Sequence, residues 1–326
     1  TNLSMRAGGL IGGPAPLSAP AVNPNAIDTS VTVLAALSGT GIYIEETDDI
    51  TIGHVDPISV TVQAEQVNFR SSPRTLLPET RSVAALDDLT SGGPIKLVAL
   101  NGTITVTDGN DADGLGVVST GAEDILLEAR GVGSDIVTTT GIQTSGGHIS
   151  LIAADSVVLG DDVRTNGAGT IYVNAQAGSI SVADGPDADL DGIVTAAGDI
   201  LLRSAVDLTI AATVTSGTGD IGLIAGRDVL QTGDVTTTGD LLVDAGRNYT
   251  MAAATNTTAQ TNLVAIATGT IALGQVSATN VGLFAGADIV DNNGALLNVS
   301  ATNLSMRAGG LIGGPAPLSA PAVNPN

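Results

Sequence analysis

The chain lacks cysteine and tryptophan, and it is poor in the other aromatic residues. Among 326 residues there are two Phe and three Tyr, so aromatic residues make up 2 % of the sequence. The absence of Cys excludes disulfides and thiol nucleophiles. A globular enzyme of this size usually fills its core with more rings, because each ring buries a large apolar area. We therefore expect a thin interior built from aliphatic side chains.

Positive charge is also scarce. Lys96 is the single lysine, and ten Arg accompany 33 acidic residues, which gives a net charge of −22. A chain with this charge repels phosphate groups and anionic lipid, so we expect no nucleic-acid partner. No apolar run approaches the roughly 20 residues of a membrane-spanning helix, so no membrane span is expected either.

The residues that catalysis usually needs are few. The two histidines, His54 and His148, stand in neither a triad nor a metal-ligand spacing. Asp161, Asp162 and Arg164 could be compared with the acidic centres of carbohydrate-cleaving β-helices, but charged corner residues are far more common. We therefore predict that the protein is not an enzyme and assign no catalytic residue.

The residues that are abundant favour strands. Hydrophobic residues make up 43 % and Gly contributes 42 residues. Apolar residues alternate with a period of two in short segments such as "GDIGLIAGRDVLQ" from 219 and "GDLLVDAGRNYTM" from 239, and a third short segment such as "VTSGTGDI" precedes most of these units. Gly, Asn and Asp corners separate the segments. This pattern predicts an all-β fold, a right-handed parallel β-helix (β-solenoid) with about three short strands in each coil.

A much longer repeat contains the short one. The 25 residues "TNLSMRAGGLIGGPAPLSAPAVNPN" occur at 1–25 and again at 302–326. We interpret 1–301 as one long repeat of continuous solenoid and 302–326 as the start of the next identical repeat, so that the sequence is a window on a longer tandem array. A duplication introduced by cloning is the alternative. First-strand positions from Leu3 to Val281 predict twelve coils in a period, or roughly 58 Å of axis.

Two segments interrupt the strand pattern. The Pro-rich segment near 8–26 and the segment near 69–93 are too long to be corners between strands. We expect both to be excursions from the solenoid, and exposed excursions on a rigid scaffold often carry binding functions.

The units between Ile95 and Gly313 resemble the haemagglutinin-repeat β-helices of filamentous haemagglutinin-like adhesins and of related autotransporter passengers. "GDIGLIAGRDVLQTGDVTTTGDLLVDAGRNYTM" carries the resemblance. It implies secretion, an extracellular or cell-surface location and a fibrous shape. The expected function is a structural segment of a bacterial surface fibre, and the alternative is an adhesin stalk or binding repeat. The expected partners are neighbouring repeats and other copies of the fibre, with host or surface glycans for the adhesin.

Two acidic loops carry the clearest chemical signal. Asp187, Asp189 and Asp191 precede Gly192 in the alternating spacing with which Ca²⁺ loops begin, although the Glu usual at the twelfth position is missing. Asp108, Asp111 and Asp113 form a weaker version in "VTDGNDADG". We predict Ca²⁺ as the one candidate cofactor and these six residues as its ligands, and hydrophilic corner loops are the alternative.

Threonines recur near the end of the third segment of several coils. Thr120, Thr144, Thr165, Thr195 and Thr237 stand two residues after an apolar anchor. Positions two apart share one face of a strand, so we expect these hydroxyls to point inward. An ice-binding solenoid would direct them outward.

Overall fold

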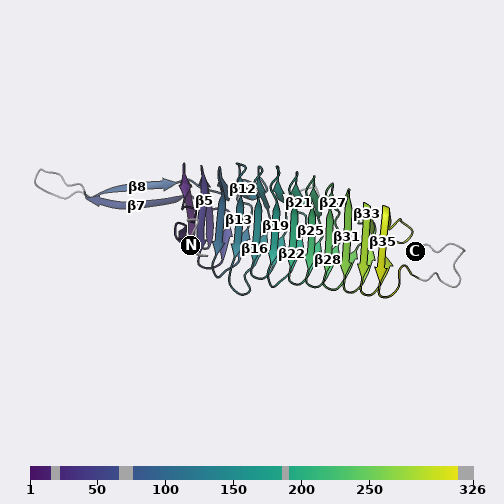
Figure 1. Ribbon diagram of the computed structural model, residues 1–326. Helices are drawn as coiled ribbons and strands as arrows, with labels where there is room; N and C mark the ends of the chain where they lie inside the picture. Colours follow the sequence, from purple (N-terminus) through teal and green to yellow (C-terminus); the bar gives the residue numbers. More distant parts are fainter. Residues whose placement is uncertain (16–22, 66–75, 186–190, 315–326) are drawn as a thin grey trace, which may run out of the picture.

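The protein is an all-β molecule whose strands stack along one axis (Figure 1). The computed structural model describes residues 1–15, 23–65, 76–185 and 191–314. Over these residues the chain forms 35 strands, of which 33 belong to one sheet system with parallel pairings and two form a separate antiparallel hairpin. The structure thus confirms the predicted parallel β-solenoid.

Each coil contributes one strand to each of three parallel columns, which we name in chain order. The first column consists of β2 (Leu10–Ile11), β3 (Ile27–Thr29), β5 (Gly41–Glu46), β10 (Ile95–Ala99), β13 (Ile125–Ala129), β16 (Ile149–Ala153), β19 (Ile171–Ala175), β22 (Ile200–Ser204), β25 (Ile221–Ala225), β28 (Leu241–Ala245), β31 (Asn262–Ala267) and the second halves of β33 (Gln275–Ala285) and β35 (Val299–Ala308).

The other two columns follow the same order. The second column consists of β6 (Ile50–Ile52), β11 (Ile104–Val106), β14 (Ile136–Thr138), β17 (Val157–Leu159), β20 (Ile180–Val182), β23 (Leu208–Ile210), β26 (Val229–Gln231), β29 (Tyr249–Met251), β32 (Ile271–Leu273) and β34 (Ile289–Asp291). The third column consists of β1 (Asn2–Ala7), β4 (Val33–Ser38), β9 (Leu89–Ser91), β12 (Leu115–Ser119), β15 (Gly141–Thr144), β18 (Val163–Thr165), β21 (Asp191–Thr195), β24 (Thr213–Ser216), β27 (Val235–Thr237), β30 (Asn256–Thr258) and the first halves of β33 and β35.

Aliphatic side chains of equivalent positions stack on one another inside the solenoid. Ile42, Ile95, Ile125 and Ile149 follow one another in the first column and are almost fully buried. Strands alternate buried and more exposed residues because successive side chains point to opposite faces. A bore this narrow needs few rings, which explains the shortage of aromatics. Tyr249 is the exception, and its buried hydroxyl donates to Gln231 Oε1 at 2.6 Å.

Hydroxyl side chains close the corner between the third column and the first. Thr144, Thr165, Thr195 and Thr237 are buried as expected. They do not bond to one another, because each donates to a carbonyl at the corner of the preceding coil, as Thr195 does to Gly169 O at 3.0 Å. The expectation for Thr120 is wrong: Thr120 is exposed, and Ser119 takes the inward position, because the strand register pairs Ser119 with Thr144.

The excursion predicted near 69–93 is a β-hairpin with different limits. β7 (Ile58–Glu65) and β8 (Leu76–Val83) pair in an antiparallel register, and residues 66–75 lie outside the described part of the chain. The excursion thus starts at Ile58, and Leu89–Ser91 belongs to the solenoid as β9. The sequence misplaced the limits because a hairpin arm has the same period-two alternation as a solenoid strand.

The excursion predicted near 8–26 is an insertion inside one strand. β2 and β3 both pair with β5, so the chain leaves the first column after Ile11 and returns at Ile27. The insertion closes where Gly13 N–H donates to Asn25 O at 2.7 Å. Gly12 has a φ of +68°, and a Cβ there would lie 2.2 Å from Tyr43 O, so only glycine fits at the exit. Residues 16–22 lie outside the described part of the chain.

Candidate metal centre and repeat junction

Four aspartates meet where the hairpin joins the solenoid. One carboxylate oxygen from each of Asp88, Asp108, Asp111 and Asp113 lies within 4.8 Å of the others. The loop between β11 and β12 supplies the three predicted ligands, and the preceding coil supplies Asp88 just before β9. The structure therefore brings together one predicted set of ligands and adds a fourth aspartate.

Asp88 is the buried member of this cluster. Its residue is 3 % exposed, its φ is +59°, and its Oδ1 has no hydrogen-bond partner among the described residues. Burial, together with the charges of Asp111 and Asp113, raises the pKa of Asp88 to about 7. A buried carboxylate without a partner is costly unless an opposite charge joins it. The cluster therefore has the electrostatics of a cation site.

Asp87 secures the base of the hairpin beside this cluster. Asp87 Oδ1 lies 2.7 Å from His54 Nδ1 and accepts a hydrogen bond from Asn110 N at 2.7 Å. The hydrogen bond to Asp87 raises the pKa of His54, and the Asn110 amide lowers the pKa of Asp87. An antiparallel bridge between Val55 and Leu86 closes the same base. The acidic loop, the hairpin base and β9 are thus joined at one point.

The second acidic loop lies largely outside the described residues. Asp187 and Asp189 fall in the segment 186–190, which the structure does not describe. Asp191 is the first residue of β21, and only its backbone is described. Asp161, which is 6 % exposed, lies in the preceding coil two residues before β18, as Asp87 lies two residues before β9. A Cβ on Gly185 would stand 2.5 Å from the Asp161 carboxyl group, so this loop also runs directly over a buried aspartate.

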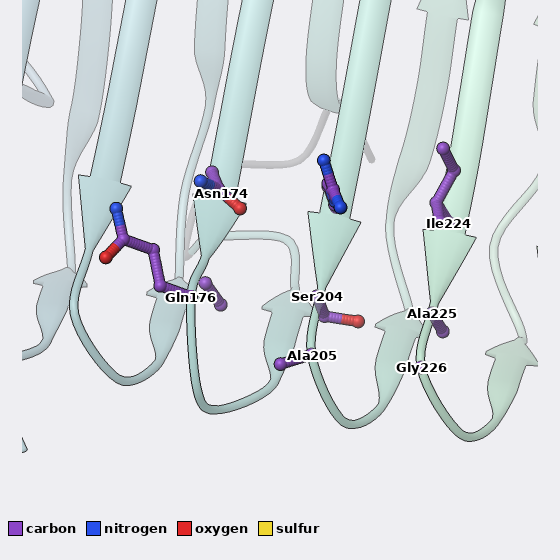
Figure 2. A pocket seen from close by; sticks show the side chains of 9 residues that line it. Asn174, Gln176, Ser204, Ala205, Ile224, Ala225 and Gly226 are labelled. Atoms are coloured by element: carbon purple, nitrogen blue, oxygen red, sulfur yellow. The ribbon is translucent and has the colours of Figure 1, made fainter. Parts of the chain in front are cut away.

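The other residues considered for chemistry are held in surface contacts. Arg164 donates to Asp162 Oδ2 at 2.7 Å, and His148 Nδ1 lies 2.8 Å from Thr170 Oγ1. A hollow of about 470 Å³ lies along the ends of β19, β22 and β25, where side chains of three successive coils stand side by side (Figure 2). Arg203 is the one ionisable residue in its lining, so this hollow offers no pair of groups for acid–base chemistry.

The two copies of the repeated segment pair with neighbouring coils on opposite sides. TNLSMRAGGLIGG occurs at 1–13 and at 302–314. In the second copy, Asn303–Ala308 pairs with 280–285 of the preceding coil. In the first copy, Asn2–Ala7 pairs with Val33–Ser38 of the following coil. The two copies together thus show both neighbours of this strand.

The next strand along the chain shows the same relation. Ile312 pairs with Ile289 in the preceding coil, and its twin Ile11 pairs with Ile42 in the following coil. An asparagine ladder reaches the junction as well, because Asn303 Nδ2 donates to Asn280 Oδ1 at 2.8 Å, and Asn280 donates to Asn262.

The two copies stand on different columns of the solenoid. Eleven successive pairings lead through the third column from β1 to the first half of β35, and the second copy then occupies the adjoining first column. One period thus spans eleven coils and one further column, or eleven and one-third coils. The twelve coils predicted from the sequence are too many, because Leu3, Val31 and Ile58 were counted as first-column positions. Ile58 belongs to the hairpin, and β4 crosses from the second column to the third without a break.

Comparison with known proteins identifies no relative: no protein-family model, no curated protein and no solved structure matches the chain. Across the ranges that the structure describes, no helix has the length and apolar character needed to cross a membrane.

Proposed function

We propose that the protein is a structural segment of an extracellular fibre, in which long repeats follow one another as one uninterrupted β-solenoid. The observation that carries this proposal is the junction geometry. When the two copies of TNLSMRAGGLIGG are superposed, strand 280–285, the shared strand and strand 33–38 form three consecutive parallel layers. No linker is needed at the junction, so backbone hydrogen bonds can run along the whole array and resist extension.

The acidic exterior suits this role. The net charge of −22 keeps neighbouring solenoids apart in dilute salt and leaves divalent cations as the means of bringing them together. A location outside a bacterial cell follows from the resemblance to secreted β-helices and forms part of the proposal.

Labelling of the source cells tests this function. An antibody raised against the chain should decorate filaments outside intact cells, and their axial period should be about 54 Å, because eleven and one-third coils repeat at about 4.8 Å each. Label confined to the cell interior would contradict the proposal.

An adhesin is the second candidate, and the hairpin favours it. Val60 and Val62 are 57 % and 55 % exposed on an isolated two-stranded ribbon, which is an unusual place for such residues. If the repeats bind host or surface glycans or cells, a single 326-residue chain should retain that binding, and removal of the hairpin should abolish it. Binding unchanged by that removal would exclude the hairpin as the contact.

We also propose that the aspartate cluster binds one Ca²⁺. Its four ligands are all carboxylates, which suit a hard cation, and the irregular loop suits the flexible coordination of Ca²⁺ better than the strict octahedron of Mg²⁺. The nearby His54 is already bonded to Asp87 and Asp56. A bound ion would tie the hairpin base to the loop of the following coil.

Calorimetric titration and melting of the 326-residue chain test the ion. Ca²⁺ at about 100 times its dissociation constant should stabilise the chain by about 2.7 kcal/mol. Asp88→Asn should remove most of this gain and raise the stability of the Ca²⁺-free chain, because it deletes a buried charge without a partner. The control is Asp244→Asn, which changes an exposed charge. If the wild type and Asp88→Asn respond equally to Ca²⁺, the site is wrong.

A further inference from the structure

The outer face of the first column carries an apolar stripe near the end of the long repeat. Two rows of outward side chains run from coil to coil in strict register: one contains Leu242, Val264 and Gly282, and the other contains Ile266 and Phe284. Leu242, Ile266 and Phe284 are each 37–38 % exposed. We call these five residues the apolar stripe.

A hollow lies on the apolar stripe beside Gly282, where a Cβ would stand 2.9 Å from the Phe284 ring. Val264 and Phe284 are among its walls, and its lining is mostly apolar. A second apolar hollow adjoins it around Gly222, between Leu201 and Leu242. Exposed apolar residues on a face of this kind mark a place where another surface packs.

The hairpin has one face that carries two exposed valines, Val60 and Val62. In β7, Ile58, Val60 and Val62 share one face, because they are two residues apart. Their direct partners in β8 lie on the same face, and these are Val83, Arg81 and Glu79. The opposite face is polar, since Ser59 Oγ lies 2.7 Å from Ser82 Oγ and Thr61 Oγ1 lies 2.8 Å from Thr80 Oγ1. One face of the ribbon thus carries the valines beside the Arg81–Glu79 ion pair, the other carries hydroxyl side chains, and both faces are exposed beyond the base.

The base of the hairpin shows which way the face with Val60 and Val62 points. Ile58 packs beside Val55 and Leu86 against the outward residues of β4, where Ala35 is completely buried. The face that carries Ile58 is thus the face turned toward the solenoid. From there the hairpin extends past the first coil, roughly along the axis and away from the C-terminal coil (Figure 1).

The repeat junction identifies what lies along that direction. Ala35 of β4 pairs with Ser4, the twin of Ser305, and Ser305 pairs with Gly282. The rows beneath the hairpin base therefore lead directly into the apolar stripe of the preceding repeat. Val62 stands four residues beyond Ile58, about 13 Å along an extended strand, and Val264 lies three coils, or about 14 Å, from Ala35.

We propose that the β7–β8 hairpin of each long repeat packs over the apolar stripe of the repeat before it, with Val60 and Val62 covering the hollow at Gly282. This inference rests on the proposed continuous array and adds a specific lock across each junction. A lateral brace of this kind joins two repeats by side chains as well as by backbone ladders, so that bending at the junction meets resistance from both. The occupant of the stripe is a segment of this same sequence.

Cross-linking in a two-repeat chain, residues 1–301 followed by 1–326, tests the contact. The native sequence has no Cys, so a disulfide can form only between the introduced cysteines. Val264→Cys in the first repeat combined with Val62→Cys in the second should form an intramolecular disulfide under mild oxidation, as should Ile266→Cys with Val62→Cys. The matched control is Thr61→Cys in place of Val62→Cys, because Thr61 lies on the opposite face of the ribbon. A single 326-residue chain with both substitutions should form no intramolecular bond.

Hydrogen exchange of the unmodified two-repeat chain gives an independent measurement. The first hairpin has no preceding repeat and the second has one, yet their peptides are identical. Residues 58–62 should therefore show two isotope populations of equal size, one fast and one slow. A single population would overturn the docking, as would equal cross-linking of the Val62 and Thr61 variants.

Electron microscopy of the same two-repeat chain separates this inference from the proposed function. A rod interrupted at the junction would contradict the continuous array itself. An uninterrupted rod whose second hairpin neither cross-links nor exchanges slowly would leave the array intact and overturn the docking alone.

Discussion

At the scale of single residues, side chains that bridge coils hold the stack in register. Thr195 Oγ1 donates to Gly169 O at 3.0 Å and accepts from Gly198 N at 2.9 Å, so one hydroxyl serves two backbone groups at a corner. Equivalent hydroxyls recur at Thr144, Thr165 and Thr237. These residues align the third column with the corner of the coil before it.

Replacing Thr195 by Val tests this role. The substitution keeps the shape but leaves Gly198 N–H and Gly169 O without their partner in a buried corner, which should cost about 1–3 kcal/mol of unfolding free energy. Thr209→Val, at an outward position of β23, should change stability by less than about 0.5 kcal/mol. Urea unfolding followed by circular dichroism measures both, and equal effects would show that the corner hydroxyls do not hold the stack.

Acid should weaken the carboxylates that link neighbouring coils. Asp207 is bonded to Arg227 (Nε–Oδ1 2.7 Å) and Asp228 to Arg247 (Nε–Oδ1 2.8 Å) in successive coils. The arginine hydrogen bonds lower the pKa of both aspartates below the ordinary value of 3.8. A lowered folded-state pKa contributes stability that is complete above pH 3.8 and is lost as the pH falls through the folded-state pKa.

The melting temperature should therefore fall steeply as the pH drops from about 4 toward about 2. The double variant Asp207→Asn/Asp228→Asn should melt lower at neutral pH and fall less steeply in acid, since two of the titrating groups are gone. Melting curves across this range measure the slope. Parallel curves for the two proteins would show that this pair of aspartates does not contribute.

The aspartate cluster shows how much of the candidate site could be predicted from the sequence. The spacing of Asp108, Asp111 and Asp113 predicted one loop, and the structure brings these three residues together. Asp88 was missed because it comes from the preceding coil, and contacts between coils depend on register rather than on spacing in the sequence. The pair Asp87–Asp88 directly before a strand was the one available signal.

At the scale of elements, alternation predicted strands well but not their partners. The stacked anchors of the first and second columns follow the pattern read from the sequence, because each buries one aliphatic side chain in the bore. Ile58 fits the same pattern but belongs to an antiparallel hairpin. Hairpin arms and solenoid strands share a period of two, so only the pairing distinguishes them.

The hairpin should be dispensable for the fold of a single period. Its described contacts with the solenoid are limited to its base, where Val55 N donates to Leu86 O at 2.8 Å and brings the two chain ends together. Replacing residues 58–83 by a short Gly-Ser link should therefore leave the β-sheet circular dichroism unchanged, since solenoid stability is a sum over neighbouring coils. Loss of the folded signal would mean that the hairpin helps to build the first coils.

At the scale of the whole molecule, one long repeat does not contain a whole number of coils. A period of eleven coils and one column means that each long repeat begins one column further round the solenoid than the repeat before it. Successive hairpins should then leave the fibre about a third of a turn apart, because each coil has three columns. The 301-residue period is evident in the sequence, but this rotation is not, because it depends on strands such as β4 that cross a corner without a break.

Cryo-electron microscopy of a chain with four consecutive repeats tests the continuous, rotating array most directly. The account predicts an unbroken rod in which each period adds about 54 Å, with hairpins on three successive sides and the fourth above the first. A flexible joint between repeats, or hairpins that all leave from one side, would contradict it.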